Sequence, residues 1–234
     1  MLSECIILAG GLGTRLQSVV SDVPKVLADV NEKPFLHYIL EEVKRQNIHH
    51  VILSVGYKHE LIQSFCEQHQ KDVSISYAIE QEPLGTGGGI ALALNQTKSE
   101  SILIINGDTF FQINYNEFYS KHLSSQSSFS IALKPMKDFD RYGSVMIDDK
   151  NRIIGFKEKQ FQYQGLINAG IYLLNKKKFQ SLSFPEKFSF EKDFMEKYFE
   201  RFPMYGFSFN NYFIDIGIPE DYYKAQQDFK TLFA

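Results

Sequence analysis

Short apolar runs and amphipathic segments alternate along the first 105 residues. Residues 5–9 are uniformly apolar and end at two glycines, and similar runs with one serine each cover 51–55 and 101–105. Runs of this kind are typical of strands that are buried on both faces of a parallel sheet. A fourth run, 74–78, alternates more clearly between apolar and polar residues. The pattern predicts four strands in this half of the chain.

The segments between these runs have helical periodicity. From Phe35 to Gln46 the apolar side chains fall three and four residues apart, at Leu36, Ile39, Leu40 and Val43. This spacing places them on one face of a helix. Shorter helices are predicted around 61–65 and 90–94. Alternating strands and helices predict a doubly wound α/β sheet with right-handed crossovers.

The second half of the chain has shorter, more alternating strand patterns. They cover residues 128–133, 143–147, 152–156 and 169–174. Residues 148–151 lie between two of these strands and predict a hairpin turn. Helices are predicted over about 189–199 and from Pro219 to about Phe229, because proline suits the first position of a helix. No repeat or low-complexity linker separates the halves, so we expect one α/β domain over 1–234 with an antiparallel insertion.

Charge and cysteine content narrow the classes of partner. The chain has 25 Lys and Arg against 28 Asp and Glu, a net charge of −3, whereas nucleic-acid-binding proteins usually carry a basic surplus. Cys5 and Cys66 have no metal-ligand spacing and are expected to be buried free thiols. The start of the chain has neither a basic segment nor a long apolar run. We therefore expect a cytoplasmic protein that binds small molecules, with no nucleic acid or membrane partner.

A glycine-rich loop follows the first predicted strand. Gly10, Gly11 and Gly13 allow backbone amides to approach a polyphosphate, and Arg15 and Lys25 add two cations. A plain tight turn or a dinucleotide-binding loop would explain the glycines alone. The dinucleotide alternative lacks an acid at the end of the second strand, and a P-loop would need Gly-Lys-Ser/Thr after the glycines. Because Arg15 and Lys25 lie in the same loop, the sequence favours a phosphate site of another kind over a plain turn.

The loop sequence Gly-Gly-Leu-Gly-Thr-Arg-Leu, followed by Pro24 and Lys25, is similar to the signature of the sugar-1-phosphate nucleotidyltransferase family. The resemblance covers nearly the whole chain. It implies a Rossmann-like doubly wound mixed sheet, the nucleotide-diphospho-sugar transferase fold, with an antiparallel sugar-binding insertion. It also implies an NTP-binding half over about 1–110 and a sugar-phosphate-binding half over about 111–234. Arg15 is then expected to hold the β- and γ-phosphates that leave as pyrophosphate, and Lys25 the α-phosphate.

The same resemblance places the nucleobase beside residues 80–89. By its spacing, Glu80 stands where relatives that use thymidine or uridine nucleotides carry an amide. A carboxylate accepts two hydrogen bonds and donates none, which suits the N1–H and N2–H₂ groups of guanine. GTP is therefore expected, although solvated charges at a helix start would also explain this acid. The further nucleotide-binding residues implied are Leu8, Gly10, Gly11, Gly13, Thr14, Gly85 and Thr86.

Two acids are candidates for a metal site. Asp108 follows a buried strand at its carboxyl end, where ligands bind in open α/β sheets. Asp215 is the partner that the resemblance supplies. Two carboxylates that are completed by phosphate oxygens and waters suit Mg²⁺, although a turn or a helix cap would also explain these acids. The catalytic residues expected are Arg15, Lys25 and Asp108, with Mg²⁺ as cofactor.

The resemblance assigns the sugar side to Gly143, Glu158, Lys159 and Asn168. Glu158 could accept hydrogen bonds from sugar hydroxyls, and Lys159 could neutralise the sugar phosphate. Gln160 departs from the family, in which proline often follows this lysine. Alternating charges that protect an exposed hairpin edge are the alternative.

Within the family the chain most resembles members that join GTP to D-glycero-α-D-manno-heptose 1-phosphate. Transfer to mannose 1-phosphate, or of a uridylyl or cytidylyl group, is the nearer alternative. A non-catalytic binding module is the more remote one, because all three expected catalytic residues are present. The resemblance leaves a homo-oligomer open.

Overall fold

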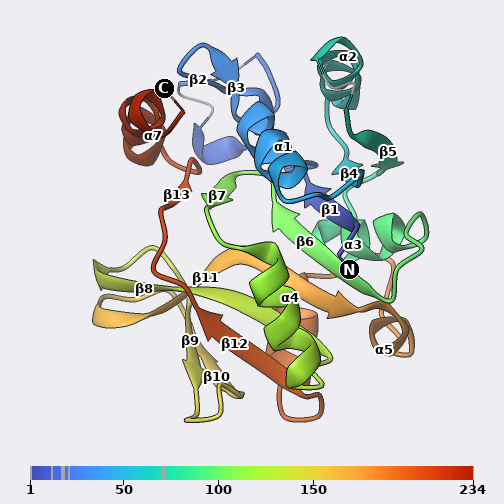
Figure 1. Cartoon of the computed structure of the whole chain (residues 1–234), viewed down its shortest axis with the longest axis vertical. Helices are drawn as coiled ribbons and strands as arrows, with labels where there is room; N and C mark the ends of the chain where they lie inside the picture. Colours follow the sequence, from blue (N-terminus) through green and yellow to red (C-terminus); the bar gives the residue numbers. More distant parts are fainter. Residues whose placement is uncertain (1, 12, 17–18, 21, 70–71, 234) are drawn as a thin grey trace.

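The computed structural model describes the chain except for residues 1, 12, 17–18, 21, 70–71 and 234. Its main sheet is mixed and has the strand order β10-β9-β11-β6-β1-β4-β5, with β8 paired to β11 and β12 paired to β8 (Figure 1). The strands of this sheet are β1 Glu4–Leu8, β4 His50–Val55, β5 Ser74–Ile79, β6 Ser101–Asn106, β8 Phe129–Phe139, β9 Ser144–Ile147, β10 Ile153–Lys157, β11 Gln162–Asn175 and β12 Met204–Ser208.

The four strands predicted in the first half form the parallel part of this sheet. Strand β1 pairs in parallel with both β4 and β6, and β4 pairs in parallel with β5. Helices connect them as the periodicity indicates, at α1 Phe35–Arg45, α2 His59–His69 and α3 Gly85–Leu94. The doubly wound arrangement is confirmed.

The sheet lies between two hydrophobic cores. Cys5 and Ile7 of β1 face the core that contains α1, whereas Ile6 between them faces the core that contains α3. All three side chains are fully buried. Because both faces are covered, this strand is apolar throughout. The cysteine prediction is also confirmed, since Cys5 and Cys66 are buried and free.

The second half forms an antiparallel extension whose strands are longer than the sequence indicates. Strand β11 pairs antiparallel with both β6 and β8, and β9 and β10 form the predicted hairpin. The strand expected over 169–174 is β11, which already begins at Gln162. The strand expected over 128–133 is β8, which continues to Phe139. Two short helices, α4 Tyr115–Ser124 and α5 Lys176–Gln180, were not predicted from the sequence.

The helix expected over 189–199 is a π-helical turn, Phe190–Met195, followed by the short helix α6 Glu196–Tyr198. Phe190 and Phe194 of this segment are buried against Phe129 and Tyr172. The π-helical turn is thus part of the core on one side. Its polar residues Glu191 and Lys192 line a cavity on the other side.

A small ribbon brings the C-terminal part of the chain back to the end of β6. It pairs β7 Thr109–Phe111 with β13 Phe213–Asp215, and Asp215 lies opposite Thr109. Helix α7, Pro219–Leu232, follows and packs beside a second ribbon, β2 Asp29–Val30 with β3 Lys33–Pro34. The Phe229 ring of α7 stacks on Phe35 of α1 at 5.9 Å between centroids.

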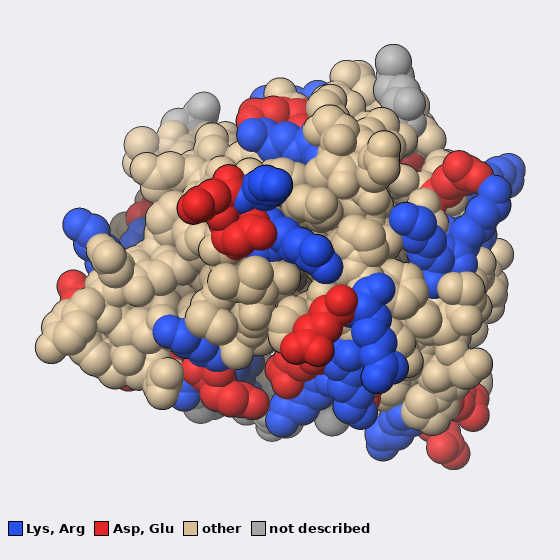
Figure 2. Space-filling model, turned by 90° about the horizontal axis from the view of Figure 1, so that it is seen from below, with Lys and Arg blue, Asp and Glu red and all other residues tan. Residues whose placement is uncertain are grey.

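The molecular surface carries mixed charge. On the face shown in Figure 2, acidic and basic side chains form mixed groups, and uncharged areas separate these groups. Among the described residues, no helix combines the length and apolar character needed to cross a lipid bilayer.

Candidate active site

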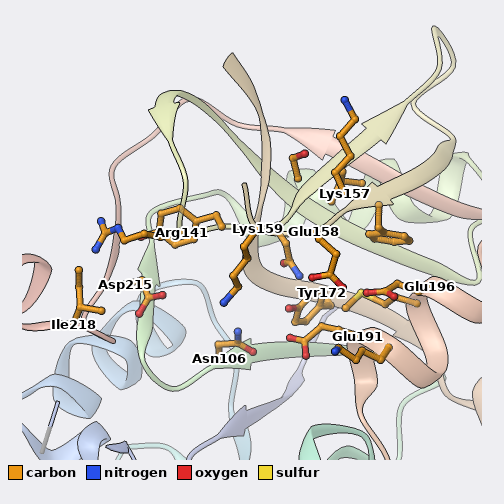
Figure 3. Close-up of a pocket in the computed structure, with 18 of the residues that line it drawn as sticks. Asn106, Arg141, Lys157, Glu158, Lys159, Tyr172, Glu191, Glu196, Asp215 and Ile218 are labelled. Atoms are coloured by element: carbon orange, nitrogen blue, oxygen red, sulfur yellow. The ribbon is translucent and has the colours of Figure 1, made fainter. Parts of the chain in front are cut away.

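Two adjoining cavities open at the carboxyl ends of β1 and β6. The glycine-loop cavity, of about 490 Å³, is bounded by the loop after β1, the start of α3 and the end of β6. The insertion cavity, of about 660 Å³, is bounded by the β9–β10 hairpin, β11 and the π-helical turn (Figure 3). They share the residues Arg15, Asn106, Tyr142, Asn168, Tyr172, Glu191 and Asp215. A ligand in one cavity would therefore lie next to a ligand in the other.

The expected site residues divide between the cavities as the sequence analysis indicates. The glycine-loop cavity is lined by Leu8, Gly10, Gly11, Gly13, Lys25, Glu80, Gly85, Thr86 and Asp108. The insertion cavity is lined by Gly143, Glu158 and Lys159. Arg15, Asn168 and Asp215 line both. The side chain of Thr14 lies outside the described part of the structure.

Lys25 and Asp108 form an ion pair at the floor of the glycine-loop cavity, between Nζ and Oδ2. The Lys25 side chain is 11% exposed and that of Asp108 is 29% exposed. Pro24 precedes a 3₁₀ turn, Lys25–Leu27, that presents the lysine. Gly13 adopts φ +61°, and a β-carbon there would lie 3.0 Å from Cβ of Lys25. The glycine loop therefore lies directly on the lysine, and only a residue without a side chain fits this position.

Asp108 and Asp215 are brought together by the β7–β13 ribbon. The Ile216 N–H donates to the Asp108 carbonyl oxygen at 3.0 Å, and the Gly217 N–H donates to Oδ1 of Asp215 at 2.7 Å. Burial and the charge of Asp108 raise the pKa of Asp215 to about 6, against the lowering effects of Lys25, the Gly217 N–H and Arg15. Two carboxylates that repel each other in a partly buried place attract a cation. Their oxygen atoms are the ligands that Mg²⁺ prefers, so the pair fits this ion.

Glu80 lies at the back of the glycine-loop cavity and also holds the loop that follows it. Its Oε2 accepts a hydrogen bond from the Leu84 N–H at 2.9 Å, and its Oε1 lies 3.5 Å from Oγ of Ser54. A β-carbon at Gly89 would lie only 2.6 Å from Oε1, so this glycine makes room for the carboxylate. Each carboxylate oxygen has a second lone pair, so both can accept a further hydrogen bond from a ligand.

The glycines at the start of α3 have a packing role that the sequence analysis did not anticipate. Gly85 adopts φ +74°, and a β-carbon there would lie 2.6 Å from the Phe188 carbonyl oxygen. The Phe188 ring occupies the space beside Gly87. The Thr86 hydroxyl accepts a hydrogen bond from the Phe190 N–H at 2.9 Å. These residues line the cavity, but they also anchor the segment that leads to the π-helical turn.

A bulge in β11 aims Asn168 at the shared wall of the two cavities. The register against β8 shifts between Asn168 and Tyr172, and Gly170 within it has φ +71°. Oδ1 of Asn168 accepts a hydrogen bond from the Gly170 N–H at 3.0 Å. Bulges often re-aim a side chain beside a functional site. In Figure 3, Lys159 points toward Asn106, and Glu158 points toward Tyr172.

Part of the insertion-cavity wall was not predicted from the sequence. Arg141 forms an ion pair with Asp221 of α7 at 2.9 Å, and the Tyr142 hydroxyl lies 3.5 Å from the same carboxylate. Burial raises the pKa of Tyr142. Other lining residues that were not predicted include Asn106, Tyr172, Glu191, Lys192 and Glu196. Charged residues that alternate with the phenylalanines of residues 184–199 are the signal that could have indicated a cavity wall at the π-helical turn.

The chain is similar in sequence and in structure to known proteins. Residues 4–231 match the model of a family described as nucleotidyl transferase. The chain is 52% identical to a D-glycero-α-D-manno-heptose 1-phosphate guanylyltransferase of Aneurinibacillus thermoaerophilus, over 96% of this chain and 97% of the relative. It is 28% identical to a mannose-1-phosphate guanylyltransferase of Mycobacterium tuberculosis, over 96% of this chain and 64% of the relative. The crystal structure of HddC from Yersinia pseudotuberculosis complexed with GMP-PN superposes with a TM-score of 0.88 and 39% identity, over 97% of this chain and all of that one.

Proposed function

The chain belongs to the nucleotidyl transferase family, and on this basis we propose that it transfers the guanylyl group of GTP to D-glycero-α-D-manno-heptose 1-phosphate, releasing pyrophosphate. The observation that carries the proposal is the full-length similarity to the heptose 1-phosphate enzyme. The similarity to the mannose 1-phosphate enzyme is much lower and covers only part of that protein.

The glycine-loop cavity receives GTP. The backbone amides of Gly10, Gly11 and Gly13 supply donors for the phosphates, and Arg15 supplies a cation for the departing pyrophosphate. The free lone pairs of Glu80 accept from N1–H and N2–H₂ of guanine, whereas the N3–H donor and carbonyl acceptors of uracil match a carboxylate poorly. Leu8, Gly85 and Thr86 complete the walls around the nucleoside.

The insertion cavity receives the sugar 1-phosphate. Lys159, which points toward Asn106 at the shared wall, neutralises the sugar phosphate (Figure 3). Glu158 and Asn168 offer hydrogen bonds to the sugar hydroxyls, and Gly143 leaves the backbone open to the ring. This placement puts the sugar phosphate next to the α-phosphate of GTP.

The chemistry then needs positioning and charge neutralisation. An ionised oxygen of the sugar phosphate forms a bond to the α-phosphorus, while the bond from that phosphorus to the oxygen bridging to the β-phosphate breaks and its electron pair leaves with pyrophosphate. The attacking oxygen is already ionised, so no side chain has to remove a proton. Lys25 neutralises the negative charge of the α-phosphate. Mg²⁺, when held by Asp108 and Asp215, supplies further neutralisation of the phosphates.

The proposal is tested by pyrophosphate release from GTP, ATP, UTP and CTP, each with the heptose, mannose and glucose 1-phosphates. The highest kcat/KM is expected for GTP with the heptose 1-phosphate. A higher kcat/KM for mannose 1-phosphate would replace the sugar assignment, and a higher one for UTP or CTP would replace the base assignment. No release with any pair would favour a non-catalytic module. The substrates are metabolites of the cytoplasm, which is the location that we propose.

A further inference from the structure

Glu191 occupies an unusual place at the junction of the two cavities. It lines both of them, whereas its neighbour Glu196 lines only the insertion cavity. Within the described residues, no other residue donates a hydrogen bond to its carboxylate or forms an ion pair with it. In Figure 3 the side chain lies beside Tyr172, between Asn106 and Glu196. A carboxylate without a partner at this position is available to a ligand.

The backbone that carries Glu191 is firmly held. Phe188 donates its N–H to the Leu84 carbonyl oxygen at 3.0 Å and accepts the Gly87 N–H at 3.0 Å. Phe190 donates its N–H to Thr86 and is almost completely buried. A capping interaction closes the turn, because the Ser189 N–H donates to Asp193 at 2.9 Å. The backbone at Glu191 is therefore held in place, so that a ligand has to order only its side chain.

The surroundings of Glu191 limit what its carboxylate can bind. Two phosphate-bearing substrates must meet at the shared wall, and an ionised carboxylate repels phosphate oxygens. The Glu191 side chain is exposed to the open cavity, but desolvation by the protein around it raises its pKa; the charge of Lys159 lowers the pKa, and the charges of Asp108 and Glu196 raise it. The carboxylate is thus incompletely compensated and is a strong acceptor for a hydroxyl donor. Hydroxyl groups are the neutral donors that a sugar 1-phosphate offers.

We propose that Glu191 is a specificity-determining residue that accepts a hydrogen bond from the ring hydroxyl next to the phosphate-bearing carbon of the sugar. This hydroxyl, on C2, is the sugar hydroxyl nearest to the phosphate. Since the phosphate must lie at the shared wall to reach the α-phosphorus, the C2 hydroxyl lies at the same wall. The hydroxyls farther from the phosphate lie deeper in the insertion cavity, toward Glu158 and Glu196. The inference rests on the proposed function and assigns one contact within it.

The test compares the heptose 1-phosphate with its 2-deoxy analogue in the wild type and in the variants Glu191→Ala and Glu191→Gln. A hydrogen bond to a charged group contributes enough for a loss of about 10- to 100-fold in kcat/KM when the C2 hydroxyl is absent. The ratio of kcat/KM for the heptose 1-phosphate to kcat/KM for its 2-deoxy analogue should show this loss in the wild type. In Glu191→Ala the ratio should be close to one. Glu191→Gln, which keeps the shape and one neutral acceptor, should give an intermediate ratio. Far-UV circular dichroism checks that both variants fold.

The matched control is Glu196→Ala, an acid-to-alanine change in the same segment. It should lower kcat/KM for both sugars by the same factor and so leave the ratio as in the wild type. An unchanged ratio in Glu191→Ala would overturn the proposal. The proposal would also be overturned if Glu191→Ala lost its preference for GTP over 2′-deoxy or 3′-deoxy GTP, because Glu191 would then contact the ribose.

The outcome for Glu191 is separable from that of the proposed function. If the wild type prefers mannose 1-phosphate, the heptose assignment fails. The same ratio is then measured with mannose 1-phosphate and its 2-deoxy analogue. The C2 contact stands or falls on that ratio.

Discussion

Asp215→Asn tests the electrostatics of the two-carboxylate site without any substrate. Burial and the neighbouring Asp108 raise the pKa of Asp215 from 3.8 to about 6 in the folded chain. Each pKa unit corresponds to about 1.4 kcal/mol of difference between the protonated and ionised forms. Ionised Asp215 therefore costs the folded state about 3 kcal/mol relative to the unfolded chain. Asparagine has no charge to bury and keeps an Oδ1 that can accept the Gly217 N–H.

The sign of the pH dependence follows from the direction of this pKa change. Below about pH 4 the carboxyl is protonated in both the folded and unfolded chain, and the cost is absent. Between about pH 4 and pH 6 the unfolded chain loses the proton first, so the cost grows as the pH rises and is complete above the folded pKa. Without divalent metal, Asp215→Asn should exceed the wild type by about 2–3 kcal/mol in free energy of unfolding at pH 8. The two proteins should converge near pH 4.

The assay is urea unfolding followed by far-UV circular dichroism, in EDTA, between pH 4 and pH 8. Asp140→Asn is the matched control, because Asp140 is exposed and its substitution removes the same formal charge. Its difference from the wild type should be small at every pH. Mg²⁺ should reverse the ranking, since the wild type alone keeps both carboxylates. A variant that is less stable at pH 8 in EDTA, or a difference that does not change with pH, would refute the reasoning.

Three further predictions concern the glycine-loop cavity. Asp108→Asn should abolish Mg²⁺-dependent pyrophosphate release while circular dichroism stays native, and retained activity would remove Asp108 from the metal site. Glu80→Gln should reduce the ratio of kcat/KM for GTP over ATP by about 10- to 100-fold, because one charged acceptor is lost; an unchanged ratio would show that Glu80 does not contact the base. Gly85→Ala should lower the free energy of unfolding by about 1–3 kcal/mol in urea titrations, since it forces alanine into φ +74° against Phe188. Wild-type stability in that variant would contradict the close packing seen there.

The sequence predicts those strands whose surroundings are the same on both faces. Cys5, Ile6 and Ile7 are all buried because helices cover the sheet on both sides, and this produces a run that is recognisable without any knowledge of pairing. Helix α4 was missed for a local reason. Its buried positions Tyr115, Phe118 and His122 have helical spacing, but a buried histidine weakens the apolar pattern.

The β7–β13 ribbon could not be predicted in the same way. Each strand has three residues, and their pairing joins Thr109 to Asp215 across most of the second half of the chain. Nothing in either segment specifies the other, because the ribbon depends on the path of the whole insertion. The resemblance to a known family was therefore the only route from the sequence to Asp215 as the partner of Asp108. The Lys25–Asp108 ion pair depends instead on the parallel pairing of β1 with β6, which brings the segment after β1 to the end of β6.

The contact between α3 and residues 188–190 links the two cavities. Leu84, Thr86 and Gly87 hold this segment through backbone groups and one hydroxyl, and the segment places Glu191 at the shared wall. The positions of the nucleoside wall and of the sugar-side acid are consequently fixed by the same hydrogen bonds. A side chain at Gly85 or Gly87 would meet Phe188 and displace both walls together. Changes at these glycines should therefore alter nucleotide and sugar recognition in parallel, whereas a change at Glu80 or Glu191 alters one and leaves the other.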